Sequence, residues 1–178
     1  MDKLMIIEKT NFKDLIIIKS PVFKDRRGFF REIYKQKILK KKLIFDCLSH
    51  SKKNTIRGLH FQKQNAQAKF ITVVQGKILD VVVDLRKKSK TFGKHFSIVM
   101  NYNSNFSILI PEGFAHGFAC LSKTCTIYYR CTNYRHQKSE TTLKWNDPEL
   151  NIKWKIKRPI LSEKDKKGIL LKDLKINI

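Results

Sequence analysis

Several ionisable side chains occupy sequence positions where an alternating strand should present apolar residues. Within the run 77–86, Asp80 and Asp84 alternate with Ile78 and Val82. Because successive side chains of a strand point to opposite faces, both carboxylates share a face with aliphatic residues. A carboxylate on such a face must be paired with a cation or must serve a cavity. The pattern therefore indicates either a buried ion pair or a reaction site.

The same pattern recurs in three further strand-like runs. Lys69 falls on the face of Ile71, and Tyr129 falls on the face of Ile127. His116 likewise shares its face with a phenylalanine and a cysteine. Any one of these groups alone is more often a hydrogen-bonded core residue. Polar groups on the apolar faces of several strands together indicate a barrel whose cavity holds a reaction site.

The histidines of this sequence are not spaced as metal ligands. His60 is followed two residues later by Gln62, and no glutamate follows before Gln75. Zinc and iron sites take three or four protein ligands, so His60 and His116 are too few. The four cysteines include no Cys-x-x-Cys pair. We expect no metal and no cofactor, which leaves both histidines for proton chemistry or for hydrogen bonds in the core.

Strand-like runs, rich in β-branched and aromatic residues and bounded by turn-forming residues, make up most of the chain. They cover residues 14–19, 28–34, 54–61, 69–75, 77–86, 94–100, 106–110, 116–121, 125–131 and 141–145. Helical patterning is weak outside 35–43 and 162–167. The pattern predicts an all-β fold, either a closed barrel or two antiparallel sheets, with a few short helices.

Length and composition limit the class of protein further. The 178 residues suffice for one hydrophobic core and no linker or repeat divides them, so we expect a single domain over 1–178. The net charge of +23 comes from lysines spread over every segment, which we interpret as a solvated surface rather than a nucleic-acid patch. No apolar stretch approaches the ~20 residues of a membrane span. We expect a cytoplasmic protein without a membrane or nucleic-acid partner.

Motifs along nearly the whole chain resemble those of one enzyme family. The most specific are RGLHFQ at 57–62 and PEGFAHGF at 111–118. The others are DRRGFF at 25–30, NAQAK at 65–69, DVVVDLR at 80–86, SKTFG at 89–93, YRCTNY at 129–134, WNDP at 145–148 and PILSEKD at 159–165. In kind and order they resemble the dTDP-4-dehydrorhamnose 3,5-epimerase family of the cupin superfamily. The resemblance implies a cupin jelly-roll barrel.

The resemblance also implies a role for four residues in epimerisation beside a ketone. This reaction needs a base to remove a proton next to the C4 carbonyl and a cation to hold the enolate oxygen. An acid must then return a proton to the opposite face of the carbon. The implied base is His60, oriented by Asp165, the implied cation is Lys69, and the implied acid is Tyr129.

Further residues are implied to bind the substrate, a nucleotide-diphosphate sugar. Arg27 and Arg57 resemble the diphosphate contacts of the family, since a guanidinium offers paired donors to phosphate oxygens. The other implied binding residues are Phe23 and Gln62, with a supporting shell of Glu32, His116 and Asp80. Strict alternation places Arg57 and His60 on opposite faces of their strand, so we predict a bulge or bend at Gly58.

Two segments differ from the family pattern. The family usually has Gln-x-Asn where residues 45–47 read FDC, at a place where nucleotide and sugar are touched. It also tends to have a second tyrosine, shortly followed by proline, where residues 135–137 read RHQ. Both differences bear on the nucleotide base and on whether one or two carbon centres are inverted.

We predict a homodimeric enzyme that inverts C3 and C5 of a dTDP-4-keto-6-deoxyhexose in rhamnose-type deoxysugar synthesis. The first alternative is a single-centre epimerase or a 3,4-ketoisomerase acting on a related nucleotide-linked 4-keto sugar. A non-catalytic cupin that binds sugar or nucleic acid is the second, and a metal-dependent cupin dioxygenase is the third. Deuterium uptake from solvent at one carbon or at two separates the first alternative from the main hypothesis.

Overall fold

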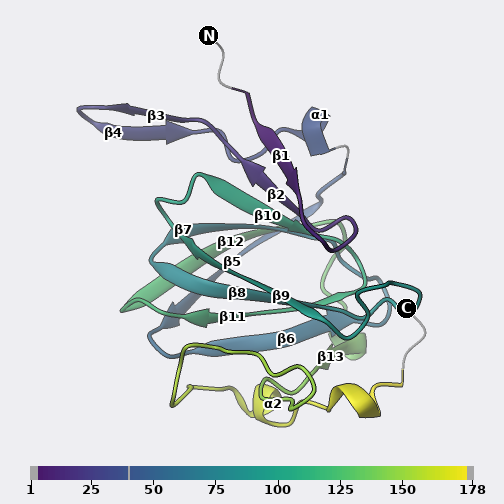
Figure 1. Cartoon of the computed structure of the whole chain (residues 1–178). Helices are drawn as coiled ribbons and strands as arrows, with labels where there is room; N and C mark the ends of the chain where they lie inside the picture. The colour runs from purple at the N-terminus through teal and green to yellow at the C-terminus, as the bar shows by residue number, and fades with distance from the viewer. Residues whose placement is uncertain (1–3, 40, 176–178) are drawn as a thin grey trace.

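The computed structural model describes residues 4–39 and 41–175 as two antiparallel sheets that face each other across a common core (Figure 1). One sheet has the strand order β1-β2-β10-β7-β12-β5, and the other has the order β13-β6-β11-β8-β9. Strands that are neighbours in the sequence are therefore often in different sheets, as in a jelly roll. The predicted all-β fold is confirmed.

The strands are short, as expected for a jelly roll. The six-stranded sheet consists of β1 (Ile6–Lys9), β2 (Ile16–Lys19), β10 (Phe106–Ile110), β7 (Lys69–Gln75), β12 (Thr124–Cys131) and β5 (Phe45–Lys52). The five-stranded sheet consists of β13 (Glu140–Thr142), β6 (Ile56–Gln62), β11 (Phe114–Cys120), β8 (Lys77–Asp84) and β9 (His95–Asn101). Two four-residue helices are α1 (Gln36–Leu39) and α2 (Glu163–Lys166), and two 3-10 turns are η1 (Gln137–Ser139) and η2 (Leu171–Asp173).

Strand β8 has the predicted two faces. Its odd positions, such as Val81 and Val83, pack on the outer face of the five-stranded sheet. Its even positions Ile78 and Val82 face the other sheet and belong to the core between the sheets. The alternation thus places Asp80 inside the barrel, because it shares a face with these two residues.

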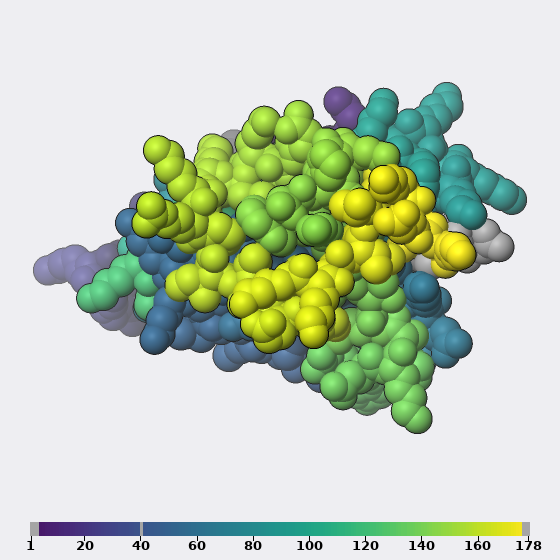
Figure 2. Space-filling model, turned by 90° about the horizontal axis from the view of Figure 1, so that it is seen from below, coloured from purple at the N-terminus to yellow at the C-terminus, as the bar shows by residue number. Residues whose placement is uncertain are grey.

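Chain segments outside the barrel cover both outer faces. The C-terminal segment, residues 143–175, lies over the five-stranded sheet and, seen from below, hides much of it (Figure 2). Its side chains Leu150 and Trp154 are buried there. On the other sheet, Tyr34 and Leu39 pack against Phe70. Covering these faces removes their apolar surface from water, which stabilises the barrel.

A separate two-stranded hairpin, β3 (Val22–Asp25) and β4 (Gly28–Arg31), projects from the body of the molecule (Figure 1). Its rings are exposed: Phe29 by 53% and Phe30 by 64%. A lone two-stranded ribbon with exposed aromatic residues has little to stabilise it within one chain.

Asp84, at the end of β8, is a structural residue. Its fully buried carboxylate accepts hydrogen bonds from the guanidinium of Arg86 at 2.9 and 2.8 Å. The hydroxyls of Ser89 and Thr91 donate to the same carboxylate at 2.7 and 2.6 Å. For Asp84, the predicted alternative of a buried ion pair therefore holds, and not that of a reaction site. The ion pair with Arg86 links the following loop to the strand.

All ten predicted strand regions overlap an observed strand, and the two helical regions contain α1 and α2. Strands β1, β3 and β5 were not predicted. Strand β5 reads FDCLSHSK, and polar residues at five of its eight positions hide its alternation. No helix in the described part of the chain combines the length and apolar character needed to cross a bilayer.

Candidate active site

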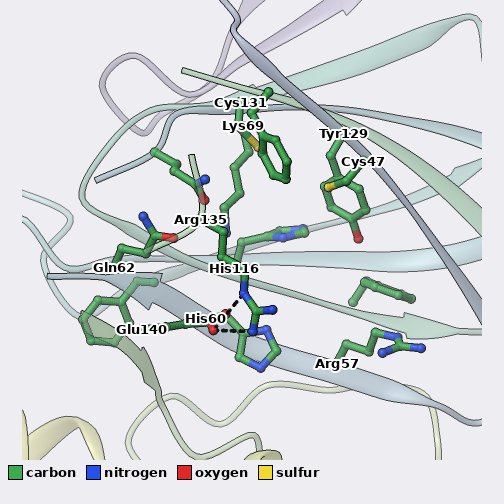
Figure 3. A pocket seen from close by; sticks show the side chains of 14 residues that line it. Cys47, Arg57, His60, Gln62, Lys69, His116, Tyr129, Cys131, Arg135 and Glu140 are labelled. Atoms are coloured by element: carbon green, nitrogen blue, oxygen red, sulfur yellow. Dashed lines mark hydrogen bonds and ion pairs between the residues drawn. The ribbon is translucent and has the colours of Figure 1, made fainter. Parts of the chain in front are cut away.

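A pocket of about 160 Å³ opens between the two sheets (Figure 3). Strands β5, β7 and β12 supply one wall, and β6 and β11 supply the opposite wall. The pocket is lined by Phe45, Cys47, Arg57, His60, Phe61, Gln62, Gln67, Lys69, His116, Phe118, Tyr129, Cys131, Arg135 and Glu140. The structure thus brings together six of the residues implied by the sequence, and two more, Asp80 and Asp165, lie directly behind the histidines.

His60 projects from β6 and is backed by a carboxylate. Its Nε2 lies 2.6 Å from Oδ1 of Asp165, which is only 2% exposed. The Ser162 hydroxyl donates to the other carboxylate oxygen at 2.8 Å, and Ser162 also caps helix α2. Burial by itself raises the pKa of Asp165, but the hydrogen bonds from His60 and Ser162 outweigh burial and the pKa is lowered. The ionised carboxylate holds the proton of His60 on Nε2 and leaves Nδ1 with a free lone pair.

Tyr129 lies on the opposite wall, on β12. The residue is 9% exposed, and burial raises the pKa of its phenol well above the ordinary value. Its hydroxyl is 3.2 Å from the hydroxyl of Ser49, and this hydrogen bond partly opposes the effect of burial. The phenol is therefore protonated at neutral pH and has a proton to donate.

Lys69 lies beside Tyr129 on the same wall, at the start of β7. Burial lowers the pKa of its ammonium, although the negative charges of Glu140 and Asp80 act in the opposite direction. Within the described residues the ammonium has no hydrogen-bond partner, so its donors are available to an oxygen that enters the pocket.

A second histidine–carboxylate pair lies at the base of the pocket. Nε2 of His116 is 2.8 Å from Oδ2 of Asp80, and both residues are buried. The ring of His116 makes an edge-to-face contact with Tyr129, with 6.2 Å between the centroids. The other oxygen of Asp80 has no hydrogen-bond partner in the described part of the chain. The pair thus lies in the five-stranded sheet and contacts Tyr129 of the other sheet across the pocket.

The predicted irregularity at Gly58 is confirmed. Arg57 pairs with Phe118 and His60 pairs with His116, so two residues of β6 oppose the single residue Gly117 of β11. This bulge shifts the alternation, and both Arg57 and His60 line the pocket. Gly58 has φ +128°, and a Cβ there would lie 2.5 Å from the Gly117 Cα. Only glycine fits at position 58, where β6 passes this close to β11.

Gln62 shapes the pocket through the segment that follows β12. Its amide donates to the Asn65 carbonyl at 2.8 Å, and its oxygen accepts from the His136 backbone at 2.9 Å. These contacts fix the segment that carries Arg135 at the pocket. Arg135 donates to Glu140 at 2.7 Å, as Figure 3 shows. Whether Gln62 also contacts a substrate stays a prediction.

Three of the implied binding residues do not line the pocket of their own chain. Phe23 and Arg27 lie on the β3–β4 hairpin, where Arg27 is 91% exposed at its side chain and pairs with Asp25. Glu32 follows the hairpin and pairs with Lys35. Their role as substrate contacts requires a neighbouring molecule.

The site also includes residues that the sequence patterns did not indicate as site residues. Phe45 and Cys47 line the pocket from β5, and Phe45 packs against Tyr134 with 6.0 Å between ring centroids. Glu140 comes from the short strand β13. For Phe45 and Cys47 the only signal in the sequence was the departure of residues 45–47 from the family pattern, and Glu140 had none. No group of three or more metal-ligating side chains is found among residues 4–39 and 41–175.

The fold and the pocket define a cupin-like barrel with a pocket of acid–base groups between its sheets. A carboxylate-backed histidine stands on one wall, and a protonated phenol and an ammonium stand on the other. Such a set of groups is suited to moving a proton from one face of a carbon atom to the other.

Comparison with known proteins identifies the family. The family model of dTDP-4-dehydrorhamnose 3,5-epimerase matches residues 9–173. The dTDP-4-dehydrorhamnose 3,5-epimerase of Salmonella typhimurium is 42% identical over 176 residues, covering 94% of this chain and 96% of the relative. This chain belongs to the dTDP-4-dehydrorhamnose 3,5-epimerase family.

Solved structures agree with this assignment. The dTDP-4-dehydrorhamnose 3,5-epimerase of Bacillus anthracis, with TDP and PPi bound, has a TM-score of 0.91 and 40% identity, covering 94% of this chain and all of that one. The dTDP-6-deoxy-D-glucose-3,5-epimerase of Legionella pneumophila, in complex with dTDP-4-keto-L-rhamnose, has a TM-score of 0.90 and 36% identity. That alignment covers 95% of this chain and 94% of the other.

Proposed function

We propose that this protein is an isomerase that inverts C3 and C5 of a dTDP-4-keto-6-deoxyhexose in deoxysugar synthesis. The observation that carries the proposal is the placement of His60 and Tyr129 on opposite walls of one pocket, with Lys69 beside the tyrosine. Membership of the family and the nucleotide-sugar ligand of the Legionella pneumophila relative support the substrate class. The chain acts as a single domain without a metal or other cofactor in this proposal.

The reaction begins with removal of a proton from a carbon next to the C4 carbonyl. Nδ1 of His60 accepts this proton because Nε2 is already held by Asp165. The imidazolium that forms is stabilised by the ionised carboxylate. The electrons of the broken C–H bond move into the C3–C4 or C4–C5 bond, and negative charge develops on O4.

Lys69 stabilises this enolate. Its ammonium lies in the pocket without a protein hydrogen-bond partner among the described residues, so it donates to O4 as the charge develops. Tyr129 then donates its proton to the carbon from the opposite wall, and the C4 carbonyl reforms. The configuration inverts because removal and return occur on opposite faces.

Arg57 is positioned to hold the diphosphate of the substrate. Its Nε donates to Ser51 at 2.9 Å and one terminal nitrogen donates to the His50 carbonyl at 3.1 Å, which orients the guanidinium at the edge of the pocket. The remaining donors are available for phosphate oxygens. His116, Asp80 and Gln62 complete the binding surface in this proposal.

A homodimer accounts for the implied binding residues outside the pocket. In a two-fold dimer, the hairpin of each chain reaches the pocket of the other and brings Arg27, Phe23 and Glu32 to the substrate. The exposed aromatic side chains of the hairpin then become covered by the partner.

A cytoplasmic location is also part of the proposal, and the four free cysteines are compatible with a reducing compartment.

The test is to incubate the protein in deuterated water with a panel of nucleotide 4-keto-6-deoxy sugars and to follow the products by mass and NMR. We expect one deuteron each at C3 and C5 of the dTDP-linked substrate. His60→Ala should lower the exchange rate by roughly 10²- to 10⁴-fold. Tyr129→Phe should retain exchange but lose inversion, because the base still removes the proton. The control His95→Ala alters a histidine outside the pocket.

Exchange at only one carbon would replace the proposal with a single-centre epimerase. Exchange with none of the panel would exclude an epimerase of this substrate class. Activity that is indifferent to both His60→Ala and Tyr129→Phe would exclude the assigned acid and base.

A further inference from the structure

Inversion at two carbon centres requires Tyr129 to donate two protons, whereas inversion at one centre requires only one. If the phenol supplies the proton at both C3 and C5, it must recover a proton between the two events while the substrate fills the pocket. Tyr129 is 9% exposed, and its pocket side is then closed by the sugar. A buried tyrosinate is strongly disfavoured, so a route for protons from solvent is needed.

Only one hydrogen bond of the Tyr129 hydroxyl is formed within the described residues, and its partner is the hydroxyl of Ser49 at 3.2 Å. Ser49 lies on β5, the edge strand of the six-stranded sheet, and is half-buried. It is not part of the pocket lining. Because Ser49 is half-buried rather than buried, its hydroxyl connects the phenol with water.

We propose that Ser49 is a positioning residue that relays a proton from water to Tyr129 between the two inversions. The inference rests on the proposed function, since it concerns the supply of the second proton. A serine hydroxyl suits this role because it donates and accepts at the same time.

Other groups around Tyr129 are less suited to the relay. The ring of His116 contacts Tyr129 edge-on, but its Nε2 is paired with Asp80. Cys47 lies directly opposite Tyr129 in the strand pairing, yet it makes no hydrogen bond with it in the described structure. A thiol is also a weak donor.

The proton balance of the relay is complete with water as the only co-reactant. Tyr129 gives its O–H proton to the substrate carbon and becomes tyrosinate. The tyrosinate takes the proton of the Ser49 hydroxyl, and the serine oxygen takes one from water. The hydroxide that remains is neutralised by the proton that His60 removed from the substrate and releases to solvent.

The experiment compares Ser49→Ala with Ser49→Thr, which keeps the hydroxyl, in the purified full-length protein. The substrate is dTDP-4-keto-6-deoxyglucose, and NMR measures the ratio of singly to doubly inverted product. We expect Ser49→Ala to accumulate the singly inverted sugar and to lower kcat by about tenfold, less than the roughly 10²- to 10⁴-fold typical of a lost general acid or base. Ser49→Thr should restore most of the double inversion.

Ser51→Ala serves as a contrast on the same strand face. Ser51 contacts Arg57, so its loss should raise KM without changing the product ratio. A solvent isotope effect measured in mixtures of H₂O and D₂O provides a second readout on the unaltered protein. A relay transfers more than one proton, so kcat should depend non-linearly on the fraction of D₂O. A linear dependence of kcat on this fraction contradicts the relay.

The outcomes separate the relay from the proposed function. If the unaltered protein inverts both centres and Ser49→Ala gives the same product ratio, the relay is wrong and the function stands. If Ser49→Thr is as impaired as Ser49→Ala, the hydroxyl is not what matters and the relay is also wrong. If the unaltered protein exchanges no deuterium at either carbon, the proposed function itself fails.

Discussion

Burial changes the pKa values of Lys69 and Tyr129 in opposite directions, although the two groups lie on neighbouring strands. Removing water disfavours the charged form of each, so the pKa of the lysine falls and that of the tyrosine rises. The shifts suit the two proposed roles. The tyrosine keeps the proton it must donate, and the lysine loses its positive charge at a lower pH than a free lysine does.

The pH dependence of the reaction should therefore report Lys69 on the alkaline side. Lys69 is protonated below its lowered pKa, so kcat/KM should decrease as the pH rises through a value below that of a free lysine. In Lys69→Arg the side chain keeps its charge at higher pH. The decrease in kcat/KM should therefore occur at a higher pH, with some loss of kcat. The measurement is a profile of kcat/KM against pH for both proteins. An unchanged alkaline limb in Lys69→Arg would assign that limb to another group.

At the scale of elements, the bulge in β6 decides which residues share the pocket. One extra residue between Arg57 and His60 re-aims one of the two side chains, and this depends on the close approach of Gly58 to Gly117. A glycine with positive φ and no room for a Cβ is a strong local requirement.

Gly58→Ala should be strongly destabilising and should inactivate the protein. The matched control is Gly28→Ala, because Gly28 has a similar φ of +136° but nothing within 4 Å of the added Cβ. Backbone strain alone costs about 1–3 kcal/mol at such a position. The steric overlap at Gly58 should add about 1–3 kcal/mol. Denaturant unfolding measures both variants, and equal losses would show that the contact with Gly117 is unimportant.

The carboxylate of Asp84 links strand β8 to the loop that follows it, and this contribution should depend on pH. Hydrogen bonds from Arg86, Ser89 and Thr91 overcome burial and lower the pKa of Asp84 to about 2. A lowered carboxyl pKa stabilises the fold above the unfolded pKa, and the stabilisation is lost as the pH falls towards 2.

Asp84→Asn should therefore lower the free energy of unfolding by about 2 kcal/mol near pH 7 and have a smaller effect near pH 2. Asp25→Asn is the control, since the ion pair between Asp25 and Arg27 is exposed on the hairpin and should contribute little. Urea unfolding between pH 2 and pH 7 measures the difference. A loss that does not change with pH would assign the effect to packing rather than to charge.

At the scale of the whole molecule, the proposed function assigns the catalytic groups to the barrel and the remaining substrate contacts to the hairpin of a second chain. Phe30→Glu, on the exposed face of the hairpin, should weaken a homodimer and raise KM at least tenfold, because Arg27 of the partner would no longer reach the substrate. Sedimentation velocity and steady-state kinetics check the two effects. Phe92→Glu replaces another exposed aromatic residue away from the hairpin and serves as the control. A monomer with normal KM would contradict the hairpin assignment.

The sequence by itself determined the all-β class, most strands and the inward face of β8, because alternation of side chains is a local property. Its motifs also identified the family and named His60, Lys69, Tyr129 and Asp165 together. It did not reveal β5, whose polar residues mask the alternation. Residues 45–47 appeared in it only as a departure from the family pattern, and Ser49 did not appear as a neighbour of Tyr129.

Only the tertiary structure decided which polar groups meet. Asp165 is 105 residues from His60, and Ser49 is 80 residues from Tyr129, so no local pattern relates them. The same holds for Asp80 and Asp84, which look alike in sequence but serve different partners, His116 and Arg86. Contacts between distant segments depend on how the two sheets are packed and registered, and short-range periodicity carries no information about that.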